Sequence, residues 1–140
     1  NGRIKELFKI QTGKYISPST IEKNINNSKY INQSLVVGFN KPYIVVLIVP
    51  AFDVLRSEFY QKLALDKDDN VNENEFLLAL FNQIMETVNE PYLESEKIVK
   101  FKLLFKEFTI ENGELTPSMK LKRLYLEDKH ASLIEKMYEG

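Results

Sequence analysis

The amino-acid sequence predicts an α+β fold, in which a small antiparallel sheet with an N-terminal hairpin is flanked by three to four helices. Residues 33–39 and 43–49 are rich in β-branched and aromatic side chains, and the short connection between them favours antiparallel pairing. Apolar residues recur at helical spacing after Pro50 and over residues 76–88, which predicts amphipathic helices. The 140 residues are 44% hydrophobic, which is sufficient for one domain with a single core.

The N-terminal part of the chain predicts a hairpin followed by a helix. Residues 7–10 and 15–16 are the two short strands, and Gly13 between them can adopt the positive φ that a tight turn needs. Ser17 is expected to cap the helix that follows, and Pro18 suits its first position. The side chains expected on its buried face are Ile21 and Ile25.

The remaining elements follow from periodicity and from turn residues. One helix is expected from Phe52 onward, and a second one has Asn72 and Glu75 as its capping pair and ends before Pro91. Residues 98–108 alternate in part between apolar and charged side chains, which predicts a half-exposed strand. A terminal helix is predicted, and its expected buried residues are Leu124, Leu133, Ile134 and Met137.

Composition excludes several classes of function. The 19 basic and 20 acidic residues give a net charge of −1, so no overall field would gather nucleic acid or an anionic membrane. The chain has no cysteine and a single histidine, His130, which is expected to be a solvated surface residue. We therefore predict no metal site, no nucleic-acid partner and no Ser-His-Asp set.

The expected setting is a cytoplasmic protein or domain. The longest apolar run, residues 43–49, is too short to span a bilayer, so no transmembrane segment is predicted. The first residues carry no capping signal and no apolar lead-in, and we interpret residues 1–140 as a single domain of a longer protein. A peripheral membrane association of that longer protein stays open.

Two segments carry groups that could act chemically. The first has basic residues at the entry of the chain, then a glycine turn and a helix that starts at a proline. The second is a loop that presents Lys120 beside Pro117 and two hydroxyl groups, and such a lysine can serve as a point charge for a carboxylate or phosphoryl oxygen. Either segment alone would be interpreted as an ordinary solvated loop, but their joint occurrence in this order favours a function.

Together these segments resemble the C-terminal domain of adenylate-forming enzymes, a superfamily that includes acyl-CoA synthetases, peptide-synthetase adenylation domains and luciferases. The resemblance covers essentially the whole chain. The residues of the motifs are most similar to those of long-chain fatty acyl-CoA synthetases. In many members a glycine stands where this chain has Met119. The motifs that carry the resemblance are Gly2-Arg3-x-Lys5-Glu6-Leu7, Gly13-Lys14-Tyr15-Ile16-Ser17-Pro18-x-x-Ile21-Glu22 and Leu115-Thr116-Pro117-x-x-Lys120-Leu121-Lys122-Arg123.

The resemblance implies a role for each motif in a two-step reaction. Lys120 would be the catalytic lysine of acyl-adenylate formation. Lys5 would be the hinge, at about residues 1–6, and Arg3 would bind nucleotide. Gly13 and Lys14 would form the turn that binds CoA in the second step, in which the thioester forms.

The resemblance also implies cofactors and partners. The full-length enzyme would use ATP, CoA, Mg²⁺ and a long-chain fatty acid, and the partner of this domain would be its own N-terminal adenylation domain. The isolated domain would bind none of these tightly and would be inactive. Two alternatives stay open from the sequence: a non-catalytic α+β protein-interaction module, and the corresponding domain of another acyl-CoA or aryl-CoA ligase.

Overall fold

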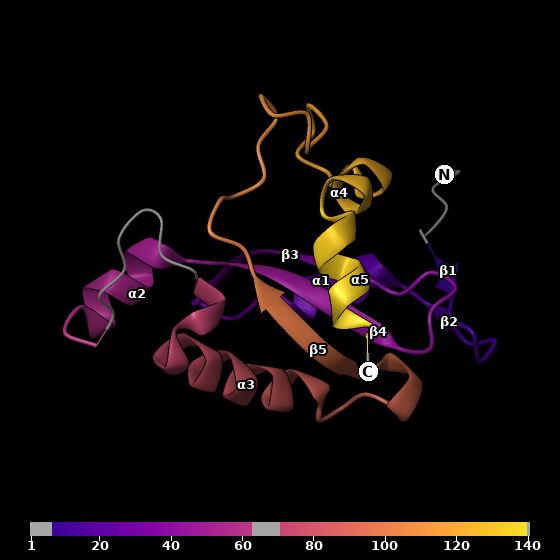
Figure 1. Cartoon of the computed structure of the whole chain (residues 1–140), viewed down its shortest axis with the longest axis horizontal. Coiled ribbons are helices and arrows are strands. Elements are labelled where there is room, and N and C mark those ends of the chain that lie inside the picture. Colours follow the sequence, from indigo (N-terminus) through magenta and orange to yellow (C-terminus); the bar gives the residue numbers. More distant parts are fainter. Residues whose placement is uncertain (1–6, 63–70, 140) are drawn as a thin grey trace.

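A computed structural model describes residues 7–62 and 71–139, which form a three-stranded sheet, a two-stranded hairpin and the helices around them (Figure 1). The predicted α+β class is confirmed. Five α-helices lie within the described residues, against the three to four predicted, and the additional one arises at the C-terminal end.

The N-terminal hairpin and helix form as predicted. Strands β1 (Phe8–Lys9) and β2 (Tyr15–Ile16) pair in the antiparallel sense, and α1 (Pro18–Ile25) follows directly. Ser17 is the N-cap residue, but its hydroxyl group lies 2.9 Å from Oγ1 of Thr20 and makes no hydrogen bond to a backbone N–H. The cap position was therefore predicted correctly, and the capping hydrogen bond was not.

The main sheet is mixed, although an antiparallel sheet was predicted. Strands β3 (Ile31–Val37) and β4 (Ile44–Pro50) form the expected antiparallel pair. Strand β5 (Ile98–Leu103) lies on the other side of β4 and pairs with it in parallel. In its described residues the long connection between β4 and β5 contains two α-helices and the short 3₁₀ helices Val71–Glu73 and Glu94–Glu96, and such a crossover returns the chain to the same end of the sheet.

The middle helices cover one face of this sheet. Helix α2 (Phe52–Phe59) follows β4, and α3 (Glu75–Asn89) runs beside β5 (Figure 1). The predicted cap of α3 was misplaced, because Oδ1 of Asn74 accepts the Leu77 N–H at 3.0 Å. Asn72 instead bonds to the backbone of Leu103 in β5.

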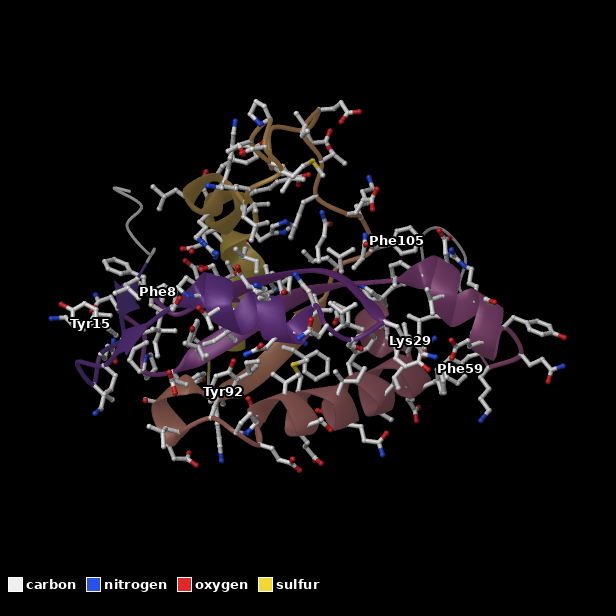
Figure 2. The ribbon with its side chains drawn as sticks, turned by 180° about the vertical axis from the view of Figure 1, so that it is seen from behind. Phe8, Tyr15, Lys29, Phe59, Tyr92 and Phe105 are labelled. Carbon is white, nitrogen blue, oxygen red and sulfur yellow. The ribbon has the colours of Figure 1, made fainter. Side chains whose placement is uncertain are left out.

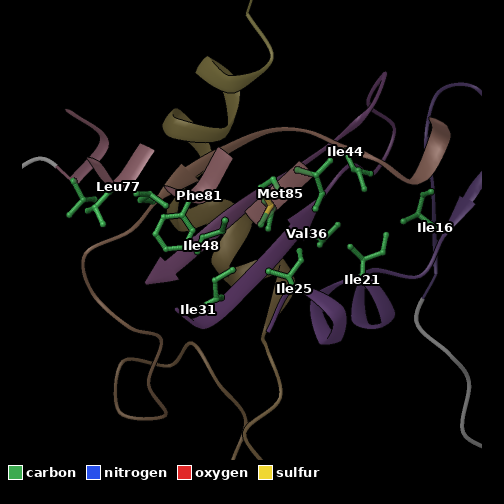
Figure 3. Packing of buried hydrophobic residues seen from close by; sticks show 14 of the residues in the cluster. Ile16, Ile21, Ile25, Ile31, Val36, Ile44, Ile48, Leu77, Phe81 and Met85 are labelled. Carbon is green, nitrogen blue, oxygen red and sulfur yellow. The ribbon is translucent and has the colours of Figure 1, made fainter. Parts of the chain in front are cut away.

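Strand β4 is buried along its whole length because the sheet separates two hydrophobic clusters. On one face the alternate residues Ile44, Val46 and Ile48 pack against α1 and α3 (Figure 3). Side chains from the other elements of this cluster include Ile16, Ile21, Ile25, Leu77, Phe81 and Met85. Full burial of one such side chain stabilises the fold by roughly 1.5–3 kcal/mol.

The opposite face is covered by the C-terminal part of the chain. The single terminal helix predicted here is two helices, α4 (Arg123–Lys129) and α5 (Ala131–Met137), which meet at His130. Leu124 is 85% exposed, so its predicted burial was wrong, and Leu126 is the buried residue of α4. Packed with Leu126 in this cluster are Leu35, Val45, Leu47, Phe108, Leu115, Ile134 and Met137.

His130 is half-buried, in contrast to the solvated position that was predicted. Its ring centroid lies 6.5 Å from that of Phe108, and its buried Nε2 atom has no hydrogen-bond partner among the described residues. Burial, followed by the charge of Lys129, lowers the pKa of His130 against a smaller opposing effect of Glu114. The neutral imidazole is therefore the form that fits this position.

Gly38 allows the N-terminal hairpin to pack closely on the end of the sheet. A Cβ atom at this position would lie 2.7 Å from Cγ2 of Ile44 and 3.0 Å from Cε1 of Phe8. The backbone also fixes the hairpin here, because the Asn40 N–H donates to the Lys9 carbonyl and the Gln11 N–H to that of Lys41. The turn at Gly13 thus projects from a firmly attached base.

Candidate functional site

Lys120 follows a tight turn at the tip of the loop before α4. The Met119 N–H donates to the Thr116 carbonyl at 2.7 Å, and the Thr116 N–H donates to the Lys120 carbonyl at 2.8 Å. Oγ1 of Thr116 accepts the Lys120 N–H at 3.0 Å, and the bridge between Leu115 and Leu121 closes the base. The backbone of Lys120 is therefore fixed at both its N–H and its carbonyl.

Met119 has a left-handed backbone conformation, with φ of 68°. This region of φ is uncommon for residues with a Cβ atom and favours glycine. The side chain of Met119 is 64% exposed, so little burial offsets this strain. The turn thus keeps a glycine-type backbone at a residue that carries a side chain.

A buried carboxylate holds the base of this loop. Glu114 is 4% exposed, and its Oε1 accepts the Thr109 N–H at 3.0 Å while Oε2 lies 2.8 Å from Nζ of Lys129. The Glu114 carbonyl accepts the Lys122 N–H at 2.9 Å, immediately after the loop. Burial alone would raise the pKa of Glu114, but the hydrogen bonds from Lys129 and Thr109 hold it below its usual value. The carboxylate thus remains charged and connects Thr109 with Lys129, while the backbone carbonyl of the same residue closes the base of the loop.

The structure joins the two segments that the sequence singled out. Glu22, at the end of the first motif, forms a two-pronged ion pair with Arg123, at the end of the second, with N–O distances of 2.6 and 2.7 Å. The side chains are 7% and 12% exposed, and Oε2 of Glu22 also accepts the Val36 N–H at 2.7 Å. Helix α1 and the start of α4 are therefore tied to each other and to strand β3.

The ammonium group of Lys120 is exposed and forms no ion pair within residues 7–62 and 71–139. By contrast, Lys129 and Arg123 close by are paired with Glu114 and Glu22. Lys120 is consequently a fixed backbone position with a cation that is available to a ligand.

The Gly13 turn is also well defined. Gly13 has φ of 93°, its N–H donates to the Ile10 carbonyl at 2.9 Å, and the Ile10 N–H donates to the Lys14 carbonyl at 3.0 Å. A Cβ atom on Gly13 would meet nothing within 4 Å, so the described part of the domain leaves the space in front of the turn open. Tyr15 beside it is 64% exposed, and Figure 2 shows Phe8 and Tyr15 at this end of the domain.

A groove of about 560 Å³ lies beside the turn. Thr12 and Lys14 line it from the hairpin, Tyr43 from the start of β4, and Leu93 and Val99 from the segment around the start of β5. Leu93 is 74% exposed and Val99 is 52% exposed, and the groove is also lined by Lys14 and Glu94, so apolar walls lie beside one ammonium and one carboxylate group. Such a groove suits an extended molecule with apolar and polar parts.

The candidate residues do not form one cluster. The hairpin with Gly13 and Lys14 and the loop with Lys120 lie at different sides of the domain (Figure 1). Arg3 and Lys5 lie outside the described residues, so their roles stay predictions. Among the residues described, no three His, Cys, Asp or Glu side chains gather as a metal site would require, and no helix is long and apolar enough to cross a bilayer.

Sequence reasoning missed the residues that support the site. Glu22 and Arg123 were part of the quoted motifs, but nothing in the sequence indicates that residues 101 positions apart form an ion pair. Glu114 was not among the predicted site residues. The sequence does hold one signal for it, because an acidic residue directly precedes the apolar Leu115 at the start of the motif.

Comparison with curated proteins shows long-chain fatty acid ligases. The chain is 33% identical over 140 residues to long-chain-fatty-acid–CoA ligase FadD15 of Mycobacterium tuberculosis, and this match covers 98% of the chain and 23% of the relative. It is 33% identical over 147 residues to long-chain-fatty-acid–CoA ligase 5 of Mus musculus, with 99% and 21% covered. The chain therefore spans less than a quarter of the length of these relatives.

Comparison with solved structures confirms the fold. The adenylation domain of a carboxylate reductase from Mycobacterium chelonae superimposes with a TM-score of 0.78 at 22% identity, covering 97% of this chain and 20% of that one. The corresponding domain from Segniliparus rugosus, in complex with AMP and a co-purified carboxylic acid, gives 0.75 at 20% identity, with 96% and 20% covered.

A sequence model of one protein family accounts for nearly the whole chain. The family is described as the AMP-binding enzyme C-terminal domain, and the match runs over residues 6–140. The resemblance that the sequence motifs carried is confirmed. The chain belongs to the C-terminal domain family of AMP-binding, adenylate-forming enzymes.

Proposed function

We propose that this chain is the mobile C-terminal domain of an ATP-dependent long-chain fatty acid–CoA ligase. In the reaction, the fatty acid carboxylate attacks the α-phosphorus of ATP and pyrophosphate leaves; the CoA thiol then attacks the acyl-adenylate and AMP leaves. The relatives named above support this substrate class, because they are long-chain-fatty-acid–CoA ligases in M. tuberculosis and mouse.

The observation that carries the proposal is the presentation of Lys120. Its backbone is held by Thr116, while its exposed ammonium has no acidic partner in the described residues. In the first step, this cation would face the carboxylate and phosphoryl oxygens and neutralise the charge that grows on them. Because the loop is already ordered, no reorganisation of the Lys120 backbone is needed when the substrate arrives.

The Gly13 turn would act in the second step, on the CoA side. Gly13 keeps the surface in front of the turn clear, and the neighbouring groove offers apolar walls with Lys14 and Glu94 among its polar groups. The extended pantetheine arm of CoA matches the apolar walls, and Lys14 is the group that could contact a phosphate. Lys5 as the hinge and Arg3 as a nucleotide contact complete the proposal, on the strength of the motif resemblance alone.

ATP, Mg²⁺ and the acyl chain would be held by the N-terminal adenylation domain of the same enzyme. Mg²⁺ binds through carboxylates and substrate phosphates. The C-terminal domain would therefore supply one cation and one CoA-facing turn to a site that its partner domain contains.

The test uses the full-length enzyme with its N-terminal domain. Lys120→Ala is expected to lower pyrophosphate release with a long-chain fatty acid by about a hundredfold or more. Conversion of supplied acyl-adenylate and CoA into thioester should be much less affected. Lys106→Ala, which removes another exposed lysine, is the matched control and should leave both steps unchanged. Pyrophosphate release that is unaltered by Lys120→Ala would show that the loop is only a solvated connector.

Gly13 is tested against a second glycine with the same backbone requirement. Gly13 and Gly113 have φ of 93° and 76°, and a Cβ atom added at either position would meet no other atom within 4 Å. Gly13→Ala and Gly113→Ala should therefore destabilise the domain to a similar extent. Only Gly13→Ala is expected to slow the reaction of acyl-adenylate with CoA. Equal kinetic effects of the two variants would assign Gly13 to turn formation alone.

A further inference from the structure

The free edge of the main sheet is closed at both ends by asparagine side chains. Strand β5 is the outer strand, with β4 on its inner side. The side-chain amide of Asn89 bonds to both the N–H and the carbonyl of Ile98, at 2.8 and 2.9 Å. Asn72 makes the same pair of bonds to Leu103, also at 2.8 and 2.9 Å. Each amide thus takes the place of one residue of a neighbouring strand.

Between these two positions, Phe101 has an outward-facing N–H with no partner among the described residues. Leu103 faces outward to Asn72, whereas the Leu104 N–H faces inward and donates to the Ile48 carbonyl at 2.7 Å. Because the backbone of a strand alternates, Phe101 has the outward phase of Leu103. Within the part of the chain that the structure describes, no partner accepts the Phe101 N–H.

The surroundings of this N–H are rich in donors. A groove of about 370 Å³ opens along the edge, and it is lined by Phe101, by Lys100 and Lys102 of β5, by Lys136 of α5 and by Asn82 of α3. None of the three lysines has an ion pair among the described residues. An acidic side chain, Glu86, lines an adjoining groove of about 160 Å³ together with Lys100.

The contacts of Lys100 leave its charge uncompensated. Its Nζ atom lies 3.4 Å from the backbone carbonyl of Glu139 and 5.9 Å from the centroid of the Tyr43 ring. A carbonyl and an aromatic face attract a cation without neutralising it. Three lysines on two elements therefore line one groove, and no acidic side chain lines it with them in the described residues.

We propose that this groove binds a phosphate group through Lys100, Lys102, Lys136 and the backbone N–H of Phe101. Between Ile98 and Leu103, which the two asparagine amides cover, only a short stretch of edge backbone around Phe101 is open; it is too short for an added strand but wide enough for a compact oxyanion. Lysines supply charge-assisted hydrogen bonds, and an N–H at a sheet edge adds a directed donor. Lysines on an edge strand also discourage pairing with other chains, and that simpler role is the competing explanation.

The first experiment follows the Phe101 amide by ¹H–¹⁵N NMR in the 140-residue chain during titration with inorganic phosphate. Sodium chloride at equal ionic strength is the reference. Saturable movement of the Phe101 signal with phosphate, and not with chloride, is expected. The variant Lys102→Gln/Lys136→Gln should weaken phosphate binding at least about tenfold. The matched double variant Lys23→Gln/Lys106→Gln removes two exposed lysines elsewhere and should bind like the parent.

A second arm distinguishes the source of the phosphate. The parent chain and the same variants are sedimented with phosphatidylcholine vesicles, with and without phosphatidic acid. Cosedimentation that needs phosphatidic acid and is lost in Lys102→Gln/Lys136→Gln would identify a lipid headgroup. Phosphate binding without cosedimentation would identify a soluble phosphate compound. No saturable shift at Phe101, or a shift unchanged by the Lys102→Gln/Lys136→Gln variant, would overturn the proposal. The role of the lysines would then be to discourage pairing of the sheet edge with other chains.

Discussion

Met119 occupies a backbone conformation that residues with a Cβ atom rarely adopt, next to the proposed catalytic lysine. Met119→Gly is expected to raise the free energy of unfolding by up to about 1 kcal/mol, because glycine adopts this φ without steric cost. Ser118→Gly is the matched control, since Ser118 is an exposed neighbour outside the positive-φ region, and it should lower stability. Chemical denaturation measures both. A loss of stability in Met119→Gly would contradict this account of the turn.

His130 gives the domain a pH dependence in a range where few other groups titrate. Its pKa in the folded state lies below the unfolded value of about 6.5, so the unfolded chain binds more protons between the two values. The contribution of the neutral His130 to stability is therefore fully present above about pH 6.5 and is lost as the pH falls through the folded-state pKa. Lys129 and Glu114, which face His130, keep their charges in this range because their pKa values are raised and lowered, respectively.

His130→Phe removes the titrating group and keeps a ring against Phe108. Denaturation curves at about pH 7 and pH 5.5 should show a fall in stability for the parent chain and a smaller one for the variant. Since His130 is the only histidine of the chain, equal pH dependence in both proteins would show that its burial does not set the slope.

At the scale of elements, the Glu22–Arg123 pair connects the helix after the Gly13 turn with the helix after the Lys120 loop. Glu22→Gln leaves Arg123 buried without this counter-charge and is expected to destabilise the domain by roughly 3 kcal/mol. Adding Arg123→Leu should recover part of this loss, because it removes the buried charge. The amide oxygen introduced by Glu22→Gln can still accept the Val36 N–H. A double-mutant cycle measured by denaturation gives the coupling. A single-variant cost under about 0.5 kcal/mol would show that the two helices are not held by this pair.

Elements whose signal is local were predictable, and those that depend on distant partners were not. The β1–β2 turn, the start of α1 at Pro18 and the β3–β4 pair followed from residues close together in sequence. The parallel direction of β5 depends on the path of the chain through α2 and α3, which alternation within residues 98–108 does not specify. The break at His130 was hidden because Leu133, Ile134 and Met137 continue a helical pattern that was expected to begin at Leu124.

The same division applies to the candidate site. Lys120 and Gly13 could be named from motifs, since the turns that present them are encoded by adjacent residues. Glu114 and the Glu22–Arg123 pair could not, because their function depends on burial and on contacts between segments far apart. The free edge of β5 could not be predicted either, because its position at the edge depends on the order of the strands in the sheet.

At the scale of the whole molecule, the domain is expected to need its partner for any turnover. The 140-residue chain, supplied with ATP, Mg²⁺, CoA and a long-chain fatty acid, should form no acyl-CoA, because the groups that hold ATP and the acyl chain would, in the proposed function, belong to an N-terminal domain. Mass spectrometry of the product checks this, with the full-length enzyme as the positive control. Thioester formation by the isolated chain would refute the proposal that the ATP and acyl sites lie in the N-terminal domain.

Strand β4 has a consequence for how the chain finds this structure. Since every one of its residues is buried between two apolar clusters, displacing it by one position would still place apolar side chains on both faces. Hydrophobicity alone therefore discriminates weakly between the native alignment and its neighbours. The discrimination falls to polar contacts on the flanking strands, such as Glu22 with the Val36 N–H and the Asn72 and Asn89 amides along β5. We expect these polar side chains, more than the core, to decide which alignment survives during folding.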